Sequence, residues 1–169
     1  MVAEYNNPLL MAATILTELQ KTFMLAPQPY PTVLAFGKII GTGATNVIPD
    51  TVKLEGTLRT MNEEHRSKCH QLIEEICQRI AAAAGGSCEV RILRGYPFLV
   101  NDEALTAQCI AAAEEYMGKE NVEELPLRMT AEDFAFFTQQ LPCCFYRLGT
   151  GNKAKGIVSG VHSATFDID

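Results

Sequence analysis

Apolar and polar positions recur with a helical period at the start of the chain. Residues 8–23 carry apolar side chains three and four positions apart, which is the spacing of one buried helix face. These positions are Leu9, Ala12, Ala13, Leu16, Leu19 and Phe23. Asn7 and Pro8 precede them in the order of a helix cap and a first-turn proline. The pattern predicts a first helix that ends before the proline-rich stretch 26–31.

Two strands are predicted after this helix. Residues 33–40 are mostly apolar and include β-branched side chains, whereas residues 51–60 alternate with a period of two. In 51–60 one face carries Val52, Leu54 and Leu58, and the other carries Lys53, Glu55, Thr57 and Arg59. The loop between the strands is rich in small residues and turns at Pro49-Asp50.

A second helix and a third strand follow. Thr60 and Glu63 have the spacing of a capping box, and Gly85-Gly86 is a typical helix stop. The apolar positions between them are Cys69, Leu72, Ile73, Ile76, Cys77 and Ile80. Residues 88–92 alternate again and predict a strand. His65 and His70 in the helix are five positions apart, so they point in different directions and are interpreted as solvated.

The order of these elements predicts an incomplete fold. Helix, strand, strand, helix, strand is a ferredoxin-like unit without its first strand. Three strands alone would leave an edge unpaired or mispaired. We therefore expect an α/β (α+β) protein whose first domain lacks a strand, and a chain that is a fragment in which Met1 is not a natural start.

The sequence changes character near Tyr96, where we place a domain boundary between 1–95 and 96–169. Asn101 is the expected cap of the first element of the second domain. The patterns predict two helices and a strand, over residues 102–117, 131–140 and 143–148. The second domain is thus expected to be an α/β piece.

Composition narrows the class of protein. Hydrophobic residues make up 47% and charged residues 20% of 169 residues, as in soluble globular proteins. A net charge of −6 without a basic cluster argues against nucleic acid as a partner, and no apolar run is long enough for a membrane span. Six cysteines without a CxxC motif are interpreted as reduced core thiols, which favours a cytoplasmic location.

Asn46 and Arg59 are candidate substrate-binding residues. Asn46 ends the small-residue loop and Arg59 lies at the end of the strand that follows it. An amide and a guanidinium are suited to a carbonyl oxygen and a carboxylate. Alternatively, Asn46 only supplies turn chemistry and Arg59 only solvates a strand face.

His162, Glu132 and Asp133 are the other residues with candidate chemistry. His162 lies in a loop among glycine and small residues, as a surface residue or as a metal ligand. Glu132 and Asp133 suggest an acid/base pair, but neighbours on a helix diverge by about a hundred degrees. Alternatively, Asp133 caps the turn at Thr130, and Glu132 contacts other residues of the site without taking a direct part in the reaction.

Four stretches together resemble the M20 metallopeptidase and amidohydrolase family. They are NVIPD at 46–50, MTAEDFAFF at 129–137, RLGTGN at 147–152 and GVHSATFDID at 160–169, and they follow the family's order. The resemblance is to the branch that hydrolyses hippurate and other N-acyl amino acids. It implies that 1–95 is a lid or dimerisation domain and that 96–169 is the C-terminal part of a catalytic domain.

The resemblance also implies a reaction and partners. M20 enzymes hydrolyse amide bonds with one or two divalent metals, usually zinc. Asn46 and Arg59 would reach an N-acyl amino acid or peptide substrate, and His162 would be a metal ligand. The family supplies most ligands and its glutamate base before the lid, so this chain is expected to hold no metal tightly and to be inactive alone. Lids of the family pair in homodimers.

A second hypothesis is a non-catalytic ferredoxin-like dimerisation or binding module. It accounts for the first domain. It does not explain why EDF, LGTG and GxH follow in the family's order.

Overall fold

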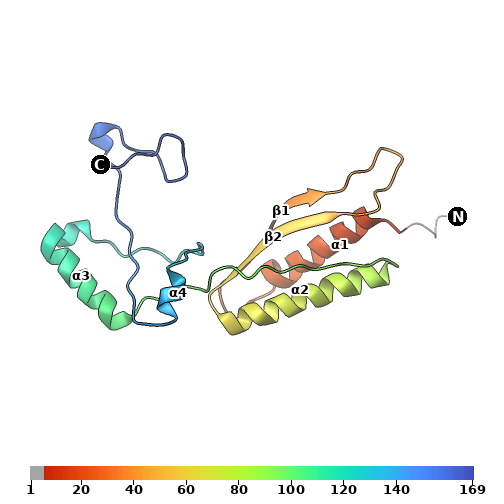
Figure 1. The fold of residues 1–169 in the computed structure, drawn as a ribbon, viewed down its shortest axis with the longest axis horizontal. Helices are drawn as coiled ribbons and strands as arrows, with labels where there is room; N and C mark the ends of the chain where they lie inside the picture. Colours follow the sequence, from red (N-terminus) through yellow and green to blue (C-terminus); the bar gives the residue numbers. More distant parts are fainter. Residues whose placement is uncertain (1–5) are drawn as a thin grey trace. The chain divides into compact units, whose positions relative to one another are not determined.

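The computed structural model describes residues 6–169 and divides the chain into two compact units (Figure 1). The first unit combines the chain up to Val100 with Glu123–Gln140. The second combines Asn101–Val122 with Leu141–Asp169. No helix within residues 6–169 is long and apolar enough to cross a membrane.

Helix α1 (Pro8–Gln20) begins where the sequence predicts. The Asn7 side chain accepts a hydrogen bond from the Leu9 N–H at 3.0 Å, and the helix continues into a π-helical turn at Lys21–Leu25. The buried residues of this region are Met11, Ala12, Ile15, Leu19 and Phe23. Leu9 and Ala13 are exposed, so the prediction of the helix is right but its buried face is rotated relative to the expected one.

Strands β1 (Thr32–Ile40) and β2 (Lys53–Thr60) form a two-stranded antiparallel sheet. In its register Leu34 pairs with Leu58, and the ladder is irregular between Phe36 and Lys38. Leu34 is buried, while Leu54 and Leu58 pack against the core. The predicted apolar face of β2 is therefore the one that faces inward.

Helix α2 (Glu63–Ala83) begins two residues later than a cap at Thr60 would place it. The cap is Asn62, whose side chain accepts a hydrogen bond from the His65 N–H at 2.8 Å. Thr60 is instead the last residue of β2, buried, with its hydroxyl 3.2 Å from that of Thr32. The predicted capping box is wrong because strand pairing already uses Thr60.

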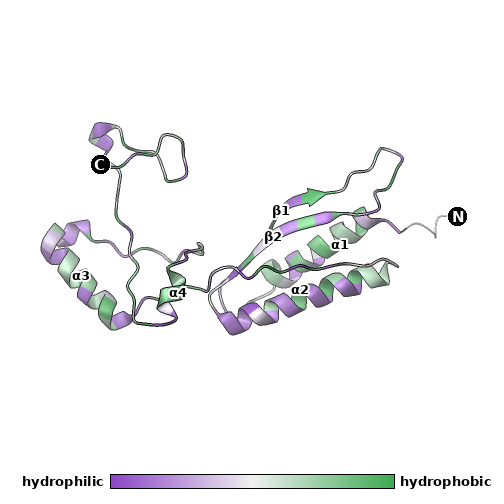
Figure 2. Cartoon of the chain, in the orientation of Figure 1, coloured by the Kyte–Doolittle hydropathy of each residue, from purple (hydrophilic) through white to green (hydrophobic). Residues whose placement is uncertain are grey.

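The core of the first unit lies between the two helices and the sheet. Helix α1 packs against α2, and α2 packs against β2. The buried cluster consists of Ile15, Leu19, Phe23, Leu34, Cys69, Ile76, Cys77 and Ile80. Figure 2 shows that α2 is mainly hydrophilic over its first turns and hydrophobic at its C-terminal end. Burial of one stripe of each helix stabilises both helices.

The predicted third strand at residues 88–92 is wrong. Residues 87–100 form no strand, and the described sheet contains only β1 and β2. Cys88 and Val90 nevertheless pack against the core, so the alternation of apolar positions is real. What the segment lacks within residues 6–169 is a neighbouring strand. The observed fold is thus mixed α/β with a small sheet.

Helix α3 (Glu103–Met117) is the main element of the second unit. Its cap is Asp102, which accepts a hydrogen bond from the Leu105 N–H at 2.8 Å, and not the expected Asn101. None of the residues of α3 is buried. The helix itself is correctly predicted, but the unit gives it no core to cover.

The predicted strand at residues 143–148 is also absent from the described structure. The segment is held by three hydrogen bonds to the residues just before α3. The Asn101 side chain accepts from the Phe145 N–H at 2.8 Å and donates to the Phe145 carbonyl at 2.9 Å. The Asp102 N–H donates to the Cys143 carbonyl at 2.8 Å. Asn101 therefore serves as a side-chain substitute for a strand partner.

Candidate functional site

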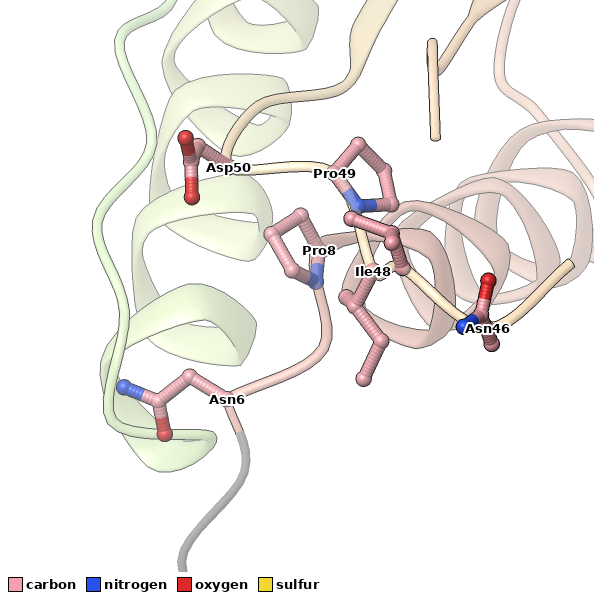
Figure 3. A pocket seen from close by; sticks show the side chains of 7 residues that line it. Asn6, Pro8, Asn46, Ile48, Pro49 and Asp50 are labelled. Carbon is pink, nitrogen blue, oxygen red and sulfur yellow. The ribbon is translucent and has the colours of Figure 1, made fainter. Parts of the chain in front are cut away.

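Asn46 lies in the tight loop between β1 and β2. Ala44 and Val47 exchange two backbone hydrogen bonds at 3.0 and 3.1 Å across it. A Cβ on Gly43 would lie 2.3 Å from the Val47 carbonyl oxygen, so only glycine fits there. The loop borders an open hollow of about 650 Å³, lined by Asn6, Pro8, Asn46, Val47, Ile48, Pro49 and Asp50 (Figure 3).

The hollow combines an apolar floor with separated polar groups. In Figure 3 the side chains of Pro8 and Ile48 lie between the Asn46 amide on one side and Asp50 and Asn6 on the other. The two amides can accept and donate hydrogen bonds, and Asp50 adds a carboxylate. No basic side chain is among the described residues that line the hollow. Its chemistry suits a carbonyl or amide group better than a carboxylate.

Arg59 lies at the opposite end of β2. Its Nη1 donates to the Met129 carbonyl at 2.9 Å, and its side chain is half-buried. Six residues of strand separate Arg59 from Lys53, which at about 3.3 Å per residue is roughly 20 Å. The structure therefore does not bring Asn46 and Arg59 together within one copy of the chain.

Glu132 and Asp133 precede α4 (Ala135–Thr138), a helix much shorter than the predicted 131–140. Glu132 is half-buried and Asp133 is exposed. The Glu132 carboxylate accepts from the Phe134 N–H at 3.4 Å, so it acts locally on the start of the helix. Ala135 is the buried residue of this helix, whereas Phe137 is 58% exposed. A single turn of helix cannot cover the face that a longer helix would.

His162 lies in an exposed turn of the second unit. Its φ of 68° is the only positive value among the non-glycine residues 6–169. The Ser163 hydroxyl donates to the Gly160 carbonyl at 2.9 Å, and the Phe166 N–H donates to the Ser163 carbonyl at 3.2 Å. This turn holds His162 in a conformation that costs on the order of 1–3 kcal/mol and that is often found at functional sites.

The residues present do not by themselves fit a metal ion. Within residues 6–169, no group of three or more His, Cys, Asp or Glu side chains could hold one. A tightly held zinc ion needs three or four protein ligands, and His162 supplies one imidazole.

The interpretation of the other two histidines as solvated is wrong. His65 and His70 are both half-buried on α2. His65 Nε2 lies 3.0 Å from the Thr32 hydroxyl and 3.3 Å from the Cys69 sulfur. Burial, with smaller contributions from Arg94 and Arg66, lowers the pKa of His70. Both imidazoles therefore belong to the packing of the first unit.

Sequence reasoning missed the ion pair of Glu63 and Arg66 at the start of α2. Arg66 Nη2 lies 2.5 Å from a Glu63 carboxylate oxygen, and Arg66 Nη1 donates to the Tyr96 carbonyl at 2.7 Å. The i,i+3 spacing of opposite charges was a signal for the ion pair. Nothing in the sequence indicated the contact with Tyr96, thirty residues away.

The chain is similar to known proteins over most of its length. The family model described as "Peptidase family M20/M25/M40" matches residues 8–169. A probable hydrolase of Synechocystis sp., sll0100, is 33% identical over 161 residues, covering 94% of this chain and 41% of that protein. The N-acetyl-L-cysteine deacetylase of Bacillus subtilis is 34% identical, covering 85% of this chain and 34% of that protein.

A solved structure shares the fold. The YXEP protein of Bacillus subtilis, described as a dinuclear metal binding peptidase from the M20 family, superposes with a TM-score of 0.73 at 24% identity. The match covers 96% of this chain and 41% of that one. The chain thus spans about two fifths or less of the length of these relatives.

Proposed function

Because the chain belongs to peptidase family M20/M25/M40, we propose that it is part of a metal-dependent amidohydrolase. The substrates would be N-acyl amino acids or small peptide-like amides. The observation that carries this proposal is the 34% identity to a protein whose name states deacetylation of N-acetyl-L-cysteine. The proposed active enzyme is a longer protein, since the relatives are more than twice as long as this chain.

His162 is the proposed metal ligand of this chain. Its support is the GVHSATFDID motif together with the left-handed backbone at the histidine. The remaining ligands would come from parts of the longer protein that this sequence does not contain. We propose zinc or another divalent ion, which would supply Lewis-acid chemistry when bound. The 169-residue chain alone is expected to be inactive.

Asn46 and Arg59 are the proposed substrate-binding residues. Because roughly 20 Å of strand lies between Arg59 and Lys53, at the end of β2 that adjoins the Asn46 loop, the two residues would act at one site only if two copies of the chain, or different parts of one substrate, were involved. Asn46 would meet a carbonyl in its hollow, and Arg59 would meet a carboxylate with the N–H groups that Met129 does not use.

The first 95 residues are proposed as a ferredoxin-like lid that lacks its first strand, with residues 96–169 as a piece of the catalytic domain. Support comes from the free edge of β2 and from the unpaired segment around Cys88 and Val90, which together leave a place for one strand. We further propose that lids pair in a homodimer and that the enzyme is cytoplasmic. If light scattering of the longer protein gave the molar mass of one subunit, this result would contradict the homodimer.

The activity is tested on the longer protein by release of free amino acid from N-acetylated amino acids, with and without a chelator. Arg59→Ala should lower kcat/KM by a factor that corresponds to roughly 1.5–3 kcal/mol, the free energy lost with a charged hydrogen bond. Arg91→Ala, at an exposed residue, is the matched control. An unchanged kcat/KM would remove Arg59 from the substrate site. Chelator-sensitive activity of the 169-residue chain alone would contradict its expected inactivity.

A further inference from the structure

We propose that the corner where β2 ends and α2 begins positions the segment 129–139, which carries Glu132 and Asp133. The residues of this corner are Arg59, Glu63 and Arg66, and all the parts involved lie in the first unit. The inference rests on the proposed function only for the importance of the segment. The contacts themselves are independent of any substrate.

Arg59 holds the residues that precede Glu132 and Asp133 in the sequence. Its Nη1 donates to the carbonyl of Met129, three residues before Glu132, at 2.9 Å. The side chain is half-buried, so water competes less for this hydrogen bond than at an exposed site. A guanidinium fixed at the end of a strand is a rigid anchor for residues 129–132, which form neither helix nor strand.

Glu63 and Arg66, at the start of α2, hold the backbone of residues 96–98. Arg66 donates to the Tyr96 carbonyl at 2.7 Å while its Nη2 pairs with Glu63 at 2.5 Å. The other oxygen of Glu63 accepts from the Phe98 N–H at 3.3 Å. Only 13% of the Arg66 side chain is exposed. The ion pair thus fixes two backbone groups of the segment 96–98.

Residues 96–98 in turn contact residues that follow Glu132 and Asp133 in the sequence. The Gln139 amide donates to the Phe98 carbonyl at 3.4 Å. The rings of Tyr96 and Phe136 meet edge to face, with centroids 5.8 Å apart and an interplanar angle of 78°. Aromatic pairs of this geometry are favourable. Both flanks of Glu132 and Asp133 are therefore tied to the same corner.

A neighbouring ion pair shows what is special about the corner. Glu64 and Lys68 on α2 also pair, at 2.7 Å, but their side chains are 78% and 69% exposed. Such a surface pair contributes little and holds no other part of the chain. Arg66 has a buried Nε without a hydrogen-bond partner among the described residues, so its charge depends on the contacts to Glu63 and Tyr96. The two pairs differ in burial and in what they hold.

Hydrogen exchange of the 169-residue chain, read by mass spectrometry, tests the proposal. Arg66→Ala should speed exchange of the Phe98 amide and of the amides in 134–140 by at least about tenfold, while amides of α2 within 73–81 keep their rates. Lys68→Ala on the same helix is the matched control and should change neither region. Equal exchange in 134–140 with and without Arg66 would overturn the proposal, as would an equal rise in every region.

A second variant covers the case in which Arg66→Ala fails to fold. Glu63→Gln keeps an acceptor for the Phe98 N–H but removes the partner charge of Arg66. It should speed exchange of the amides in 134–140 and leave the melting temperature of the core unchanged. Unchanged exchange in 134–140 would overturn the proposal. These readouts need no substrate, so their failure is distinct from a failure of the proposed amidohydrolase activity.

Discussion

The two units of the chain differ sharply in how much they bury. In the first unit, eight side chains from α1, the π-helical turn after it, β1 and α2 form one contiguous buried cluster. In the second unit, whose residues the structure describes completely, Cys143 alone is buried. Helices of similar length thus meet very different surroundings, because α1 has four buried residues and α3 has none.

The comparison shows that helix formation and core formation are separate problems. Helix α3 has its cap at Asp102 and its stop at Gly118, so it is locally complete. Ile110, Tyr116 and Met117 on it remain exposed. Most helical stability in proteins comes from packing an apolar face. The second unit is therefore expected to be much less stable than the first, and the following predictions test this difference.

The largest effect is expected from core truncation. Leu19→Ala removes a side chain that is 0% exposed and should lower the free energy of unfolding by about 2–5 kcal/mol. Ile110→Ala on α3, where the side chain is 46% exposed, should cost less than about 1 kcal/mol. Urea unfolding followed by circular dichroism measures both. Equal losses would mean that α3 has a core partner of the same quality.

Thiol labelling should separate the two units next. Burial, with a smaller effect of Cys88, raises the pKa of Cys77 to about 11, so at pH 8 roughly one thiol in a thousand is the reactive thiolate. Cys144 in the second unit is only half-buried. Iodoacetamide at pH 8 should therefore modify Cys144 at least about tenfold faster than Cys77 in the folded chain, as measured by peptide mass spectrometry. Labelling in urea, where both thiols are exposed, is the control.

A smaller effect is expected from pH. In the unfolded chain the pKa of His70 is near 6.5, and in the folded chain it is lower. As the pH falls, His70 is therefore protonated in the unfolded chain at a higher pH than in the folded chain. The stability that neutral His70 contributes is thus present above about pH 6.5 and is lost as the pH falls through the lowered pKa. His70→Asn should flatten the fall in unfolding free energy between pH 7.5 and 5.5. A slope unaffected by His70→Asn would contradict this assignment.

The sequence alone determined the local elements of this protein. The first helix and its Asn7 cap follow from periodicity and capping chemistry. Both strands of the hairpin, α2 and α3 follow from periodicity alone, since the caps of the two helices are not the predicted ones. The family motifs likewise located the candidate residues Asn46, Arg59 and His162, whose roles stay predictions. These features depend on neighbours within a few positions of the chain, and so they can be read from one short stretch at a time.

Only the tertiary structure decided what those elements pair with. Residues 88–92 have the pattern of a strand, but a strand exists only where another backbone supplies hydrogen bonds, and none within residues 6–169 does so. The contact from Arg66 to Tyr96 and the contact from Arg59 to Met129 likewise join residues thirty and seventy positions apart. Such contacts depend on where the chain returns in space, which no local pattern specifies.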